Sequence, residues 1–220
     1  PYDAGIVQAG WADWKFRSSV GNTRNPVSMG FIFSTPPSTQ LAMATDTTLS
    51  YAYAVNFDLE AEYPKIFATN ATYAESSMSF MTPPNPTRLD TLRNRGAKMI
   101  VVHGLSDGIF SPDDTAAWWR AVDASHGGAS DFVRYFQVPG MGHSRGGPST
   151  DQYDALTTLV DWVEKGMAPD RIIATARGPG NAAAVNADVP ASWSPSRSRP
   201  LCPYPLVARY KGGDVETAAS

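Results

Sequence analysis

An alternation of apolar runs and amphipathic segments, beginning at residue 86, is the feature that most constrains the fold of this sequence. Residues 98–103 form a continuous apolar run closed by Gly104, as in a strand that is buried on both faces of a sheet. Residues 131–138, rich in β-branched and aromatic side chains, form a second strand pattern. A helical pattern follows each of them. Strand, helix, strand and helix in this order normally build a parallel sheet, so the sequence predicts an α/β fold.

Start and stop signals bound the two helical patterns. The first begins at Ser111, a predicted N-cap, with Pro112 at the first helical position and Asp114 in capping-box spacing. It ends near residue 125, before Gly127. The second spans about 150–165 and carries apolar residues on one face: Tyr153, Leu156, Val160 and Val163.

The sequence changes character near residue 85. Residues 1–85 contain scattered aromatic residues but no sustained periodicity, and they predict only short helices around 58–69. The stretch Thr82–Pro86 has the sequence TPPNP, through which no helix or central strand continues. We therefore expect two units, residues 1–85 and 86–220. Residues 178–205 are rich in Pro, Ala and Ser and predict an extended wrap over the surface, and the last ten residues either continue it or form a disordered tail.

Composition and charge exclude several classes of protein. No stretch approaches the roughly 18 consecutive apolar residues of a membrane span, so we expect no membrane partner. The 18 Lys and Arg nearly balance the 21 Asp and Glu and form no basic run, which argues against a nucleic-acid partner. Cys202 is the single cysteine, which excludes an internal disulfide framework and a multi-cysteine zinc site. With three histidines in the chain, we expect neither a metal site nor a cofactor.

Each predicted strand is followed by a loop with a chemically useful side chain. Asp107 lies in the GLSDG loop after the first strand, and His143 ends the PGMGH loop after the second. In open parallel sheets, catalytic groups gather beyond the carboxyl ends of the strands. We expect Asp107 and His143 to meet there as the acid and the base of a Ser-His-Asp triad. The alternative for Asp107 is a turn aspartate that binds its own loop.

The GLSDG loop also matches G-x-S-x-G, the pattern of a nucleophile elbow. In such an elbow the helix starts directly after the serine, whereas the helix signals here begin at Ser111. We therefore favour Asp107 as the acid, with the nucleophile outside the chain. A small self-contained hydrolase that uses Ser106 remains an alternative hypothesis. We expect His103 to be structural and bonded to a neighbouring backbone carbonyl, and His126 to lie at a solvent-exposed helix end.

Four segments together resemble the C-terminal part of the tannase and feruloyl esterase family: RGAKMIVVHGLSDGIFSPDDTAAWW, FQVPGMGHSRGGP, ALTTLVDWVEKGMAPDRIIATARG and RPLCPYPLVARYKG. The family consists of α/β-hydrolase serine esterases with a large lid. The resemblance implies that residues 86–220 are the C-terminal part of the catalytic α/β-hydrolase domain, with a parallel sheet and flanking helices. Residues 1–85, with DAGIVQAGWADW, resemble a remnant of the lid domain more loosely.

Carried over to this sequence, the resemblance makes Asp107 the triad acid and His143 the triad base. It places the nucleophilic serine before Pro1, in the remaining N-terminal part of the enzyme or in a second subunit. The family's lid calcium site is also expected there. Two positions depart from the family pattern. Ser144 stands where many members have a disulfide-bonded cysteine, and Cys202 lacks the C-terminal cysteine with which it usually pairs.

The same resemblance implies a secreted or periplasmic ester hydrolase with a small aromatic ester as substrate, such as a feruloyl or galloyl ester. Three aromatic residues of the lid-like part, Trp11, Trp14 and Phe16, are candidates for flat apolar walls around the substrate. The alternative hypothesis is a catalytically silent chain that binds aromatic ligands or a partner subunit.

Overall fold

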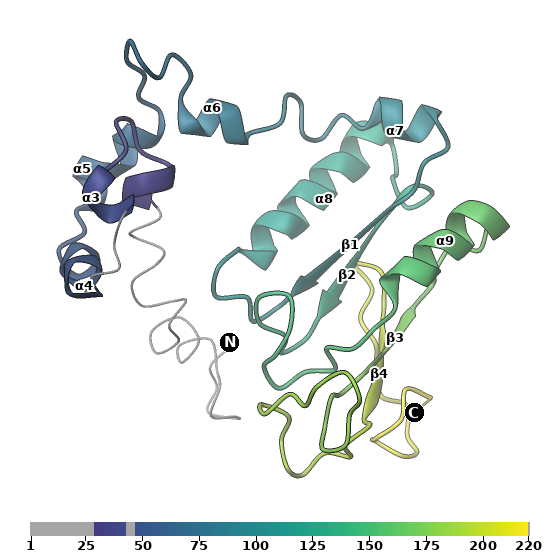
Figure 1. The fold of residues 1–220 in the computed structure, drawn as a ribbon. Coiled ribbons are helices and arrows are strands. Elements are labelled where there is room, and N and C mark those ends of the chain that lie inside the picture. Colours follow the sequence, from purple (N-terminus) through teal and green to yellow (C-terminus); the bar gives the residue numbers. More distant parts are fainter. Residues whose placement is uncertain (1–28, 43–46, 220) are drawn as a thin grey trace. The chain divides into compact units, whose positions relative to one another are not determined.

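The computed structural model describes residues 29–42 and 47–219 (Figure 1). They fall into two compact units, of which one ends at Pro86 and the other begins at Thr87. The first unit contains short helices: α3 (Thr39–Ala42), α4 (Thr47–Val55), α5 (Leu59–Glu62), the 3₁₀ helix η1 (Tyr63–Ile66) and α6 (Ser77–Met81). The short helices predicted around 58–69 are thus confirmed.

Hydrogen bonds connect separate segments of the first unit. The hydroxyl of Tyr53 on α4 donates to Oε2 of Glu62 at the end of α5, over 3.1 Å. Burial, followed by this bond and the charge of Glu62, raises the pKa of Tyr53 to about 12. The backbone N–H of Thr35 also donates to the carbonyl of Lys65 in η1, over 3.0 Å.

The second unit is built on two parallel strands. Strands β1 (Met99–Gly104) and β2 (Val133–Val138) pair in parallel along their whole length, from Met99 opposite Val133 to Gly104 opposite Val138. Helix α7 (Asp90–Asn94) precedes β1, α8 (Pro112–His126) connects the two strands, and α9 (Ala155–Lys165) follows β2. The predicted order of strand, helix, strand and helix is confirmed, together with the parallel pairing.

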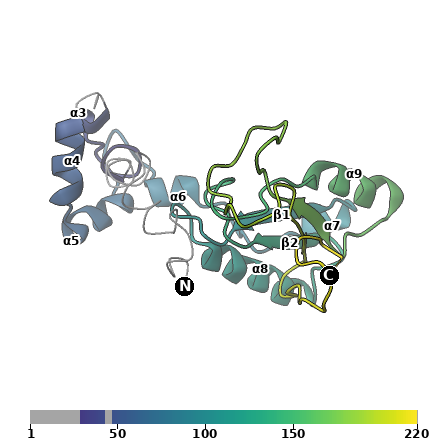
Figure 2. The same cartoon turned by 90° about the horizontal axis from the view of Figure 1, so that it is seen from below.

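Helices cover the two faces of this sheet. One face packs on α8 through Ala116, Trp119 and Val122, which join Val133 and Tyr135 of β2 in a buried cluster. The other face carries a second buried cluster, which contains Phe136 and Val138 of β2 and is joined by Ala155 of α9. Figure 2 shows α8 and α9 on opposite sides of the strands.

A second, antiparallel sheet follows α9 in the chain. Strand β3 (Ile172–Thr175) pairs with β4 (Ser198–Leu201), and neither strand was expected from the sequence. Pro203, just after β4, bridges to Phe136 of β2, which connects the two sheets. The wrap predicted for 178–205 is therefore partly wrong, because residues 198–201 within it form β4. The tail is also held, since Glu216 forms an ion pair with Arg197.

Ser111 caps the start of α8 as predicted, with Pro112 at the first helical position. The hydroxyl of Ser111 accepts a 3.2 Å hydrogen bond from the backbone N–H of Asp114, which satisfies one of the free donors of the first turn. At the other end Gly127 adopts a left-handed conformation with φ of 63°, which glycine reaches without a Cβ penalty.

Two predicted boundaries are shifted. Strand β2 begins at Val133 rather than at residue 131, because the backbone turns at Ala129, whose carbonyl accepts from the N–H groups of Phe132 and Val133. Helix α9 begins at Ala155 rather than at 150, because Gln152 pairs instead with Thr175. In α9 the buried side chain is that of Trp162, whereas the predicted apolar face is largely exposed, at Leu156, Val160 and Val163.

Candidate active site

The loops that follow β1 and β2 meet at one edge of the parallel sheet. The backbone N–H of Ser106 in the first loop donates to the carbonyl of Met141 in the second, over 2.9 Å. Gly104 permits this approach, because a Cβ at that position would overlap the carbonyl oxygens of Met141 and Gly142. The two loops are therefore bonded directly to each other.

Asp107 and His143 are hydrogen-bonded across this contact. Nδ1 of His143 lies 2.9 Å from Oδ2 of Asp107. The Asp107 side chain is 3% exposed and the His143 side chain 36% exposed. The other carboxylate oxygen, Oδ1, accepts from the backbone N–H groups of Ile109 at 2.7 Å and Phe110 at 3.1 Å. The structure thus brings together a buried carboxylate and an imidazole that solvent reaches.

The surroundings of Asp107 keep its carboxyl group ionised. Burial alone would raise the pKa of Asp107, but the hydrogen bonds from His143 and from the backbone N–H groups of Ile109 and Phe110 outweigh it and hold the pKa below its usual range. An ionised carboxylate can only accept hydrogen bonds, so Nδ1 of His143 carries the proton. In the neutral ring, Nε2 then has a free lone pair with which to accept a proton.

His103 is a second imidazole on the same carboxylate oxygen. Its Nε2 lies 3.1 Å from Oδ2 of Asp107, and its Nδ1 lies 2.8 Å from Oγ1 of Thr115. Because the carboxylate accepts, Nε2 of His103 carries the proton and Nδ1 accepts from the threonine hydroxyl. The prediction of a backbone carbonyl partner is wrong. The sequence could not reveal the contact, since packing of α8 against β1 places Thr115 there.

Phe110 forms a wall beside the imidazole of His143. The ring centroids are 5.2 Å apart and the planes are tilted by 59°. The backbone N–H of Phe110 binds Asp107, whereas its side chain remains 62% exposed. One residue thus contacts both members of the pair and presents an exposed aromatic ring next to them.

Ser106 does not occupy a nucleophile elbow. Strand β1 ends at Gly104 and α8 begins at Pro112, with Ser111 as its N-cap, so a loop separates Ser106 from the helix. Among the described residues, no serine hydroxyl forms a hydrogen bond with His143. The helix signal in the sequence had already argued against this serine. The three aromatic candidates Trp11, Trp14 and Phe16 lie outside the described residues.

His126 differs from its prediction as a solvent-exposed helix end. Its side chain is 2% exposed, and its ring packs edge-on against Phe132 with centroids 5.2 Å apart. Its Nδ1 lies 2.8 Å from the carbonyl of Val122. The residue therefore packs at the end of α8 and belongs to neither of the loops that carry Asp107 and His143.

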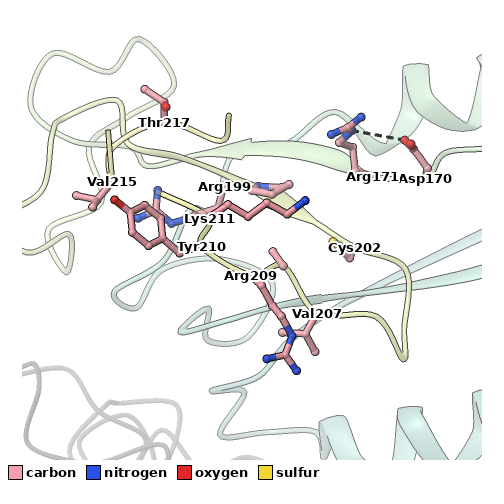
Figure 3. Close-up of a pocket in the computed structure, with 12 residues that line it drawn as sticks. Asp170, Arg171, Arg199, Cys202, Val207, Arg209, Tyr210, Lys211, Val215 and Thr217 are labelled. Carbon is pink, nitrogen blue, oxygen red and sulfur yellow. Dashed lines mark ion pairs between the residues drawn. The ribbon is translucent and has the colours of Figure 1, made fainter. Parts of the chain in front are cut away.

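Two cavities lie beside β4 and the C-terminal segment. The larger, of about 760 Å³, is lined by several cations and is drawn in Figure 3. There the side chains of Arg209 and Lys211 point in different directions, so these cations do not converge on one point. A cavity of about 430 Å³ shares the free, half-buried Cys202 with it. Neither cavity is lined by Asp107 or His143.

The described residues hold neither a candidate metal site nor a membrane-spanning helix. No group of three or more His, Cys, Asp or Glu side chains there could hold a metal ion. Within the same ranges, no helix combines the length and the apolar character needed to cross a membrane.

Comparison with solved structures supports the fold. An esterase from Aspergillus oryzae superimposes with a TM-score of 0.50 at 22% identity, over 80% of this chain and 32% of that chain. Together with the parallel sheet and its flanking helices, this likeness confirms the α/β-hydrolase type of fold predicted from the sequence.

Sequence comparison identifies the family. The chain is 42% identical over 226 residues to a mono(2-hydroxyethyl) terephthalate hydrolase of Piscinibacter sakaiensis, over 96% of this chain and 34% of that protein. It is 34% identical over 175 residues to a probable feruloyl esterase of Arthroderma benhamiae, over 76% of this chain and 30% of that protein. The chain thus spans about a third of the length of these curated relatives. A family model described as tannase and feruloyl esterase matches residues 4–220, and the chain belongs to that family.

Proposed function

We propose that this chain supplies the acid and the base of a carboxylic ester hydrolase with a Ser-His-Asp mechanism. The observation that carries the proposal is the 2.9 Å hydrogen bond between the buried carboxylate of Asp107 and the partly exposed imidazole of His143. Both lie in loops after parallel strands, where α/β enzymes gather their catalytic groups. The nucleophilic serine comes from protein outside these residues, in an N-terminal part of the enzyme or in a second subunit.

In this mechanism His143 moves one proton in each half-reaction. Its Nε2 takes the proton of the serine hydroxyl while the serine oxygen attacks the ester carbonyl carbon. The proton then passes to the departing alcohol, which leaves an acyl-enzyme. In the second half-reaction water attacks the acyl carbonyl carbon and gives a proton to Nε2. Nε2 then returns this proton to the serine oxygen as the carboxylic acid leaves. Asp107 fixes the tautomer of the ring and stabilises the imidazolium.

The substrate class we propose is a small ester of an aromatic acid, such as a feruloyl or galloyl ester or a terephthalate monoester. The names of the relatives support this class, because one is a mono(2-hydroxyethyl) terephthalate hydrolase and another a probable feruloyl esterase. The exposed ring of Phe110 beside His143 offers a flat apolar surface for such an acyl group. We further propose a secreted or periplasmic enzyme that needs no cofactor for this step.

Alanine substitution of the base tests the function. In the complete enzyme, His143→Ala should lower kcat for methyl ferulate, methyl gallate or mono(2-hydroxyethyl) terephthalate by about 10³- to 10⁴-fold. Asp107→Asn should act similarly, because its amide no longer holds the ring as a carboxylate does. Circular dichroism provides the control for folding. Activity of His143→Ala within tenfold of the original would contradict the proposal, and tight binding of the aromatic acid without turnover would instead support a silent binding chain.

A further inference from the structure

The turn that carries His143 is bonded to a loop much later in the chain. We call residues 141–149 the His143 turn and residues 177–190 the distal loop. The backbone N–H of Gly147 in the turn donates to Oδ2 of Asp188 over 2.9 Å. Its carbonyl accepts from Nδ2 of Asn186 over 2.8 Å. The backbone N–H and the carbonyl of Gly147 are therefore both bound by side chains of the distal loop.

The His143 turn has an unusual backbone that bonds within the turn hold only in part. The backbone N–H of Ser149 donates to the carbonyl of Gly147 over 2.8 Å, and its hydroxyl donates to the carbonyl of Gly146 over 3.0 Å. Ser144, next to the histidine, has a φ of 65°, and Gly147 has a φ of 71°. The left-handed region is costly for a non-glycine residue. At Gly147 a side chain would also overlap the carbonyl of Gly140. Inside the turn, the N–H of Gly142 reaches the carbonyl of Gly146 over 3.2 Å.

A buried ion pair anchors the distal loop to the end of the turn. Nε and Nη2 of Arg177 bind the two carboxylate oxygens of Asp151 over 3.0 and 2.6 Å. The Asp151 side chain is fully buried and also accepts from the N–H of Gly146 over 2.8 Å. The third nitrogen of the guanidinium, Nη1, donates to the carbonyl of Ala184 over 2.9 Å. One carboxylate thus connects the turn to the base of the distal loop.

The distal loop orders its own two contact residues. Asn186 is 6% exposed, and its Oδ1 accepts from the N–H of Asp188 over 3.0 Å. Its backbone N–H donates to the carbonyl of Arg177 over 2.7 Å. The side-chain amide of Asn186 therefore donates to the turn through its nitrogen and accepts from the backbone of Asp188 through its oxygen, and Asp188 in turn binds the N–H of Gly147. The two contact residues and Gly147 thus form one connected set of hydrogen bonds.

From these contacts we propose that Asn186 and Asp188 are positioning residues for His143. By binding the backbone of Gly147, they fix the conformation of the turn. The imidazole of His143 then stays within hydrogen-bonding distance of Asp107, and its Nε2 faces the nucleophile. The proposal rests on the proposed function, since it concerns the geometry of that base. A displacement of about 1 Å at a catalytic group costs on the order of a hundredfold in rate. A residue that never touches the substrate can therefore control kcat here.

The test compares Asp188→Ala with Asp188→Asn in the complete enzyme. The asparagine keeps an oxygen that can accept from Gly147, whereas the alanine loses it. Asp188→Ala should lower kcat per mole of folded protein about 10- to 100-fold with KM changed less than threefold, and Asp188→Asn should restore most of the rate. Asn186→Asp should also lower kcat, because a carboxylate replaces the donor to the Gly147 carbonyl.

Asn181→Ala is the matched control in the same loop. Asn181 binds Gln152 and Ala183 and makes no hydrogen bond to the His143 turn. This variant should keep the original kcat. A second readout is the downfield proton resonance of the hydrogen bond between His143 and Asp107, which should be lost in Asp188→Ala and present in Asp188→Asn.

The outcomes separate this inference from the proposed function. If His143→Ala is inactive while Asp188→Ala and Asn186→Asp keep the original kcat per folded molecule, the positioning role is wrong and the base assignment stands. Equal losses in Asp188→Ala and Asp188→Asn would also overturn it. If His143→Ala itself remains active, the proposed function fails, whatever the distal-loop variants do.

Discussion

His103 donates from Nε2 to Oδ2 of Asp107 over 3.1 Å, and this is the same oxygen that accepts from His143. One carboxylate oxygen therefore orients two imidazoles, while the other oxygen is held by backbone N–H groups. The carboxylate has little freedom to rotate, because each oxygen is fixed by two donors. A rigid acceptor of this kind suits a residue whose task is to hold a histidine in one tautomer.

Thr115→Val should weaken this arrangement without removing a charged group. The hydroxyl of Thr115 lies 2.8 Å from Nδ1 of His103 and fixes the proton on Nε2. Its loss removes a hydrogen bond worth about 1 kcal/mol, which corresponds to roughly fivefold in kcat. Thr115→Ser keeps the hydroxyl and should retain the rate. Steady-state kinetics on an aromatic ester measures both, and equal kcat values for the two variants would show that His103 does not act through Asp107.

Gly104→Ala should separate the two loops that carry Asp107 and His143. The new Cβ would overlap two carbonyl oxygens of the loop that bears His143, and such overpacking costs about 1–3 kcal/mol. We expect a lower free energy of unfolding in urea and a larger fall in kcat than the loss of folded protein explains. The control is Gly96→Ala, where φ is 70° but no atom lies within 4 Å of the added Cβ. Its cost should be limited to about 1–2 kcal/mol of backbone strain, with kcat unchanged.

Phe110→Ala should affect substrate binding more than stability. The side chain is 62% exposed, so its removal should leave the melting temperature nearly unchanged. Stacking of its ring on an aromatic acyl group, as proposed above, would be worth about 0.5–1.5 kcal/mol, so KM for an aromatic ester should rise roughly 2- to 12-fold. An aliphatic ester such as ethyl butyrate provides the comparison. A KM that rises equally for both esters would argue against a stacking role.

Stability should fall at low pH through two buried carboxylates. The pKa values of Asp107 and Asp151 lie below their usual range in the folded protein, despite burial, because of the donors around them. Groups with a depressed pKa stabilise the fold above the unfolded value of about 3.9, and that contribution is lost as pH falls through the folded value. The free energy of unfolding should therefore decrease below about pH 4.

Asp151→Asn tests the share of that pH dependence that belongs to Asp151. The variant should be less stable than the original at pH 7, because the Arg177 guanidinium loses its ionised partner. It should also lose less stability between pH 5 and pH 3. Urea denaturation at several pH values measures this difference, and equal pH slopes for both proteins would contradict the role of Asp151.

The sequence was informative where short-range signals decide the structure. The apolar run before Gly104 and the capping residue Ser111 predicted β1 and α8, and the parallel order predicted that Asp107 and His143 lie at one edge. Each of these depends on residues within one turn or one strand, or on the general geometry of parallel sheets. The proximity of Asp107 and His143 could therefore be predicted without knowledge of the long-range contacts elsewhere in the fold.

The features that the sequence did not predict depend on distant partners. Strands β3 and β4 have four residues each, and β4 contains Pro200, which discourages a strand prediction. They form because Ile172 and Leu201 meet across the sheet in the core. The contact of His103 with Thr115 and the buried position of His126 likewise follow from packing of α8. The hydrogen bond from Asn186 to Gly147 joins residues 39 positions apart, and no local sequence pattern predicts it.

The position of the distal loop in the chain has a consequence for protein synthesis. Gly147 is bound by side chains that lie 39 and 41 positions later. While the ribosome makes the protein from its N-terminus, Asp107 and His143 emerge well before Asn186 and Asp188 do. We expect the turn that carries His143 to remain loosely held in the nascent chain until the distal loop has emerged and docked. The hydrogen bond between Asp107 and His143 would then reach its final geometry only after residues 186–188 have been synthesised.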